Sequence, residues 1–101
     1  MLITRWQASI LPAKEQILLM YRLEGLSPEE EILPVGAIIA DHRHPFDEIR
    51  TVLSGELFVN VSGNKLLLRS GDRIVIPSNT KHSYQVEKAP DCVSLYANRV
   101  Y

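Results

Sequence analysis

Two histidines and a glutamate lie close together in the stretch from Gly36 to Gly55, and their spacing limits how this segment can fold. His42 and His44 are two residues apart, and side chains at positions i and i+2 of a β-strand project from the same face. Pro45 interrupts such a strand, and Glu48 then stands at the start of the next apolar run. We therefore expect two strands joined by a short turn, with the three side chains directed toward one point.

The third and last histidine of the chain, His82, follows a second patterned stretch that begins at Gly71. If a neighbouring strand brings His82 to the same corner, three imidazoles meet one carboxylate. This donor set suits a divalent transition metal such as manganese, iron, nickel or zinc, and does not select among them. We predict a metal site made of His42, His44, Glu48 and His82. The alternative is a set of hydrogen-bonded side chains without a metal.

Most of the chain after Glu31 consists of short apolar or alternating runs separated by turn residues. Leu57, Val59 and Val61 alternate with more polar neighbours, which is typical of a half-buried strand. The predicted strands are residues 2–6, 32–40, 49–53, 57–61, 65–69, 73–76, 82–87 and 92–98. Many short strands with Gly, Pro and Asn turns indicate a mainly β fold, an antiparallel sandwich or barrel.

One helix is predicted before these strands, over residues 12–24. Pro12 is tolerated at a helix start, whereas Gly25 and Pro28 mark its end. Its apolar face consists of Ile17, Leu18, Met20 and Tyr21. We expect this face to pack on the barrel or on a partner subunit.

Length and charge narrow the functions that the chain can have. With 101 residues we expect one domain, 1–101, with the helix at about 12–24 and the barrel at about 30–99. The net charge of −1, without a basic patch, argues against nucleic acid as a partner. A domain of this size buries a modest core, and we therefore expect a homodimer.

Three further features concern location and single residues. No segment has the length of a membrane span or the pattern of a signal peptide, so we expect no membrane partner and a cytoplasmic location. Cys92 is the only cysteine, which excludes an intrachain disulfide, and its apolar surroundings predict a small buried side chain. We interpret the acidic run Glu29–Glu31 as a solvated turn.

The two patterned stretches resemble the motifs of the cupins, which are small β-barrels of the jelly-roll kind. The first cupin motif is Gly, five residues, His, one residue, His, three or four residues, Glu, six residues, Gly. The chain matches every position with Gly36, His42, His44, Glu48 and Gly55. The resemblance implies a jelly-roll barrel with a metal and a small-molecule pocket inside it.

The second cupin motif is Gly, five residues, Pro, one residue, Gly, two residues, His, three residues, Asn. Gly71, Pro77 and His82 match it, whereas Asn79 stands for the second Gly and Val86 for the final Asn. Asparagine enters the left-handed backbone region more readily than most residues, so we expect Asn79 to preserve the turn. Val86 removes a polar group that the family carries near the mouth of the barrel.

Strand periodicity adds candidate pocket residues. Arg50 shares a strand face with Glu48, and Tyr84 shares one with His82. Arg50 is a candidate anchor for a substrate carboxylate, the alternative being a rim arginine paired with Asp47 or solvent. Tyr84 is a candidate proton or hydrogen-bond donor, the alternative being that it only fills the barrel. The expected apolar lining consists of Phe46 and Ile38.

Three functions remain open from the sequence. Small cupins with this ligand set resemble metal-dependent dioxygenases and isomerases that act on small oxygenated molecules. Other cupins bind or sense a small molecule without turnover. In a third possibility the metal only stabilises the fold, in which case a chelator should unfold the domain.

Overall fold

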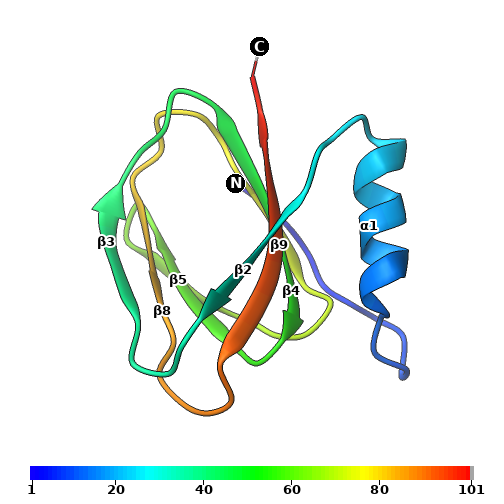
Figure 1. The fold of residues 1–101 in the computed structure, drawn as a ribbon. Coiled ribbons are helices and arrows are strands. Elements are labelled where there is room, and N and C mark those ends of the chain that lie inside the picture. The colour runs from blue at the N-terminus through cyan, green and yellow to red at the C-terminus, as the bar shows by residue number, and fades with distance from the viewer. Residues whose placement is uncertain (101) are drawn as a thin grey trace.

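The structure is a computed structural model that describes residues 1–100, and it consists of two antiparallel β-sheets and one α-helix (Figure 1). The elements are β1 (Leu2–Thr4), α1 (Lys14–Leu23), β2 (Glu29–Leu33), β3 (Ile38–His42), β4 (Asp47–Ser54), β5 (Leu57–Val61), β6 (Asn64–Leu68), β7 (Arg73–Ile76), β8 (His82–Gln85) and β9 (Cys92–Arg99). One sheet has the order β1-β7-β4-β9-β2 and the other the order β3-β8-β5-β6. The predicted mainly β fold with one N-terminal helix is confirmed, as two facing sheets in a jelly-roll arrangement rather than a closed barrel within residues 1–100.

The segment predicted as one strand over residues 32–40 is two strands. β2 ends at Leu33 and β3 begins at Ile38. Pro34 has no backbone N–H for a sheet, and Gly36 has a φ of 89°, which suits a turn. The apolar character of the run hid this break, because hydrophobicity alone does not distinguish a strand from a turn made of apolar residues.

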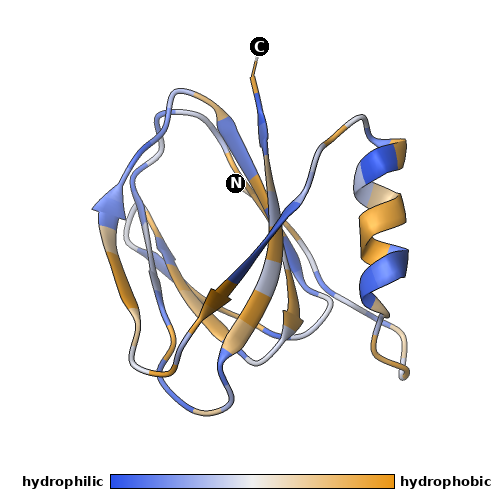
Figure 2. Cartoon of the chain, in the orientation of Figure 1, coloured by the Kyte–Doolittle hydropathy of each residue, from blue (hydrophilic) through white to orange (hydrophobic). Residues whose placement is uncertain are grey.

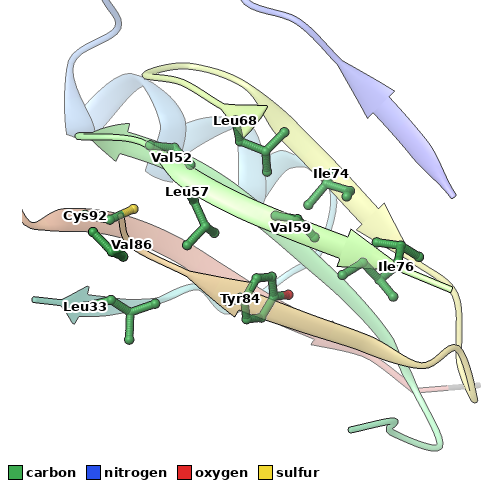
Figure 3. Packing of buried hydrophobic residues seen from close by; sticks show 11 residues of the cluster. Leu33, Val52, Leu57, Val59, Leu68, Ile74, Ile76, Tyr84, Val86 and Cys92 are labelled. Carbon is green, nitrogen blue, oxygen red and sulfur yellow. The ribbon is translucent and has the colours of Figure 1, made fainter. Parts of the chain in front are cut away.

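The side chains between the two sheets form the main core, and Figure 3 shows how they interdigitate. Alternation along β5 places Leu57, Val59 and Val61 in this core, as the sequence predicts. Cys92 is also fully buried there, and burial raises the pKa of its thiol to about 11. The cysteine is therefore a small apolar side chain and not a nucleophile.

Helix α1 covers the outer face of the five-stranded sheet (Figure 1), and its apolar middle is visible in Figure 2. Ile17 and Tyr21 are buried against β4 and β9, whereas Met20, expected on the same face, is 40% exposed. The Tyr21 hydroxyl lies 2.8 Å from Thr51 Oγ1 on β4. Because of this helix, β4 is buried on both faces. No helix in the described part of the chain has the length and apolar character to cross a membrane.

The helix ends as its sequence predicts. Gly25 has a φ of 75°. The Leu26 N–H donates a 2.9 Å hydrogen bond to the carbonyl of Tyr21, five positions earlier in the chain. This is the pattern of a glycine-terminated helix whose last carbonyls are satisfied by the following turn. Leu26 is buried beside Ile17 and Tyr21 and fixes the exit of the chain.

Gly55→Ala is expected to destabilise the turn between β4 and β5. Gly55 has a φ of 78°, and a Cβ at this position would lie 2.6 Å from the backbone oxygen of Asp91. Gly63→Ala is the matched control, because Gly63 has a φ of 91° but open space around its Cβ position. Denaturant unfolding should show a loss of more than about 1 kcal/mol for Gly55→Ala beyond that of the control. Equal losses would mean that the close approach to Asp91 has no energetic effect.

Candidate metal centre

The four predicted metal ligands come together between the two sheets. His42 is the last residue of β3 and His82 the first of β8, and the two are direct partners in the antiparallel pairing. Glu48 reaches them from β4 in the other sheet, and His44 from the loop after β3. Their candidate ligand atoms all lie within 4.8 Å of one another. The sequence predicts that His42 and His44 lie on one strand. This is wrong for His44, because β3 ends at His42.

A β-bulge in β3 brings His42 to this cluster. Ile39 pairs with Tyr84, and His42 pairs with His82. Between these two pairs β3 contains two residues and β8 only one, so β3 has one extra residue. The extra residue reverses the alternation, and Ile39 and His42 therefore both face the space between the sheets. The prediction that Ile38 lines the pocket is wrong, because Ile38 points outward and is 71% exposed.

Backbone carbonyls set the tautomers of two histidines. Nδ1 of His42 lies 2.9 Å from the carbonyl oxygen of Ala40, and Nδ1 of His82 lies 2.8 Å from that of Thr80. A carbonyl only accepts, so the neutral rings carry their protons on Nδ1 and leave lone pairs on Nε2. Burial lowers the pKa of His82 below its ordinary value, against the attraction of Glu48. Both rings thus have the form that binds a metal through Nε2.

The cluster fits a divalent metal on its own chemistry. His82 is 1% exposed, and its Nε2 has no hydrogen-bond partner among the described residues, which is unfavourable for a buried polar atom. Glu48 Oε1 lies 3.3 Å from His44 Nε2 and 3.9 Å from His82 Nε2. Ligand atoms that share one ion at about 2.1 Å are separated by roughly 3–4 Å. Imidazole nitrogens and a carboxylate oxygen are donors suited to the transition metals named above.

The Glu48 side chain uses its two oxygens differently. Oε2 accepts hydrogen bonds from the Tyr84 hydroxyl and from Arg50 Nε, the latter at 3.1 Å, while Oε1 faces the histidines. Burial raises the pKa of Glu48, but Arg50 and Tyr84 outweigh it, and the net pKa lies below its ordinary value. Burial also raises the pKa of Tyr84 well above its usual range, so the phenol stays protonated and donates. The carboxylate is thereby held ionised with one oxygen available.

Arg50 is a buried residue and not the rim arginine that one sequence hypothesis considered. It is 3% exposed, and Nη1 donates to Glu31 Oε1 at 2.8 Å and to Ser94 Oγ at 2.7 Å. Its guanidinium carbon lies 4.7 Å from the ring centre of Tyr84 and 4.9 Å from that of Tyr96. Nε and Nη1 of Arg50 are thus engaged by Glu48, Glu31 and Ser94. The sequence hypothesis that Arg50 anchors a substrate carboxylate stays a prediction.

Sequence reasoning missed two residues of this site, Glu31 and Tyr96. A cavity of about 230 Å³ adjoins the cluster. It is lined by Glu31, Ile39, His42, His44, Glu48, Arg50, Tyr84 and Tyr96. The interpretation of the acidic run as a solvated turn is wrong, because these residues form β2. The signal for Glu31 was its position two residues before Leu33, a core residue on the same strand face.

A larger groove of about 630 Å³ lies elsewhere, along β6 and the N-terminal segment. Its lining contains no histidine, and its one carboxylate, Asp72, already accepts from Arg5 and from the backbone N–H of Trp6. The smaller cavity is therefore the candidate site, because it holds the convergent donors.

A comparison with protein families matches residues 29–96 to the cupin domain. This chain belongs to the cupin family. None of the curated proteins compared with it matches. Among solved structures, this cupin is similar to KdgF from Halomonas sp., with 26% identity and a TM-score of 0.65 over 75% of this chain and 71% of that chain.

Two enzymes in larger chains share the same fold. The DMSP lyase DddQ from Ruegeria pomeroyi has 26% identity and a TM-score of 0.68 over 74% of this cupin and 38% of that chain. A salicylate 1,2-dioxygenase from Pseudaminobacter salicylatoxidans has 24% identity and a TM-score of 0.67 over 73% of this cupin and 21% of that chain. The cupin thus spans about two fifths of the lyase and about one fifth of the dioxygenase. The similarity to the dioxygenase shows the fold alone.

The second cupin motif supports the loop that carries His44. Asn79 has a φ of 59°, in the left-handed region that its place in the motif predicts. Its N–H donates a 2.6 Å hydrogen bond to the carbonyl of His44. The ring of Phe46, expected as apolar lining, stacks on His44 with centroids 4.8 Å apart. Val86, in place of the motif asparagine, is fully buried in the core.

Proposed function

We propose that this cupin binds one divalent transition metal through His42, His44, Glu48 and His82. The unpartnered, buried Nε2 of His82, directed at Glu48 and the other imidazoles, carries the proposal. When bound, such a metal polarises oxygen groups of a substrate as a Lewis acid and orients them for reaction. The adjacent cavity of about 230 Å³ then takes a small oxygenated molecule.

We further propose that the protein is a metal-dependent enzyme of the dioxygenase or isomerase class. Support comes from the ionised carboxylate fixed beside the cavity and from the protonated phenol of Tyr84, and the similarity to a lyase supports catalysis on this fold. The second candidate is a non-catalytic binding or sensing cupin. The dense pairing of Arg50 with Glu31 and Glu48 favours this candidate, because it leaves few groups free to move protons.

Elemental analysis of protein purified without an affinity tag tests the proposal. We expect about one transition metal per chain, and about none after His42→Ala. Oxygen uptake and product analysis with the iron and manganese forms then separate an enzyme from a binding protein, which returns its ligand unchanged. If a chelator unfolds the protein at once, the metal has a structural role instead.

The homodimer and the cytoplasmic location stay predictions. Light scattering measures the molar mass and so tests the homodimer.

Tyr84 and Arg50 are proposed as positioning residues that act through Glu48. Tyr84→Phe is expected to weaken zinc binding by about 10- to 100-fold, because the carboxylate loses a hydrogen bond that orients it. Tyr21→Phe is the matched control, since it also removes a buried hydroxyl but on the other side of β4. Competition with a chromogenic chelator measures the zinc affinity of each variant. Equal affinities in the two variants would contradict the positioning role of Tyr84.

A further inference from the structure

The cavity beside the metal cluster has an acidic wall whose nearest cation is already paired. Among the described residues that line it, Arg50 is the one arginine or lysine, and it binds two carboxylates. Nε faces Glu48 and Nη1 faces Glu31, so a single guanidinium group separates the two acids. The positive charge of Arg50 is therefore already neutralised by carboxylates of the protein itself.

Glu31 is the open member of this group. Its side chain is 33% exposed, whereas those of Glu48 and Arg50 are 5% and 4% exposed. Oε1 accepts from Arg50, and a carboxylate has about four lone-pair sites, so acceptor capacity remains on the cavity side. Glu31 lies on β2, an edge strand of its sheet, and lines the cavity, where a ligand can reach it.

We propose that the ligand of this cupin carries hydrogen-bond donors, and no negative charge, at the end remote from the metal. This inference rests on the metal site proposed above. A hydroxyl or ammonium group at that end donates to the carboxylate of Glu31. A second ligand carboxylate there would lie beside Glu31 with no unpaired cation to receive it, and such like-charge contacts are unfavourable. The substrate class is thus a polyhydroxylated or amino-substituted chelating molecule and not a dicarboxylate.

Four matched compounds test this inference on zinc-loaded protein, because zinc is redox-inert and binding is measured without turnover. All share a 2-hydroxy acid head that chelates the metal, and they differ at the distal group. They are 2-hydroxybutanoate, 2,4-dihydroxybutanoate, 4-amino-2-hydroxybutanoate and malate. Calorimetry is expected to rank the hydroxyl and ammonium compounds tightest, the methyl compound next, and malate weakest by about tenfold or more against the hydroxyl compound.

Two variants show whether Glu31 is the cause. Glu31→Gln keeps an oxygen for Arg50 but removes the charge, and it should reduce the discrimination against malate by about tenfold. Glu30→Gln is the matched control, because Glu30 has the same charge but faces away and pairs with Lys14 at 2.8 Å. It should keep the wild-type ranking.

The outcomes separate this inference from the function on which it rests. Malate binding as tightly as the hydroxyl compound, an unchanged ranking in Glu31→Gln, or no binding of any of the four would overturn the inference. Zinc stoichiometry is measured first in each protein. A wild-type protein that takes up no zinc would contradict the metal site itself.

Discussion

Arg50→Met is expected to lower the free energy of unfolding of the metal-free protein by about 3–5 kcal/mol. Glu48 is 4% exposed and relies on Arg50 for the positive charge that keeps its carboxylate ionised. Methionine fills much of the same volume but leaves this carboxylate, and that of Glu31, without their ion-pair partner. A buried charge without a partner is far less favourable than the intact pair. Denaturant unfolding measures the change.

A second arginine provides the control for this prediction. Arg73 also forms an ion pair, with Nη2 2.6 Å from Glu24 Oε1, but the two side chains are 17% and 36% exposed. Arg73→Met should therefore change stability by no more than about 1 kcal/mol. The double variant Arg50→Met with Glu48→Gln should recover part of the loss, because it removes the buried charge. A loss from Arg50→Met no larger than that from Arg73→Met would contradict the buried-pair account.

His82→Ala is expected to weaken zinc binding at least about a hundredfold, which equals about 2.7 kcal/mol at 25 °C. His82 supplies the most buried donor of the cluster, and the hydrogen bond from its Nδ1 to Thr80 holds the ring in place. A water that replaces the ring lacks this fixed orientation. Competition with a chelator measures the affinity.

Cys92→Ala is the control for the loss of a buried residue. Cys92 lies in the core between the sheets, and its raised thiol pKa makes it a poor metal ligand. Its replacement should lower stability slightly and leave zinc affinity unchanged. If the two variants lose zinc affinity equally, the effect of His82→Ala arises from general disruption of the core.

The parts of this fold that depend on local signals are visible in the sequence. β7 has its predicted bounds, residues 73–76, because Gly71 and Pro77 enclose a short apolar run. The helix ends before Gly25 for the same kind of reason. The cluster of His42 and His82 was predictable because two motif spacings point to one corner of the fold.

The rest depends on pairings between distant segments. The bulge that places Ile39 and not Ile38 in the cavity appears only when β3 is set against β8. Glu31 and Tyr96 join the site because β2 and β4 both pair with β9, which is the last strand of the chain. Periodicity assigns each strand two faces but does not say which strand lies beside it. The acidic run therefore had no visible partner until Arg50 was placed opposite it.

X-ray absorption spectroscopy of the zinc-loaded protein identifies the atoms that bind the metal and so tests the four-residue site itself. We expect a first shell of nitrogen and oxygen with the multiple scattering of about three imidazoles and no sulfur, because His42, His44, His82 and Glu48 form the cluster. His44→Ala should remove one imidazole from this shell. A shell that contains sulfur, or one without imidazole, would place the metal elsewhere and rule out the four-residue site.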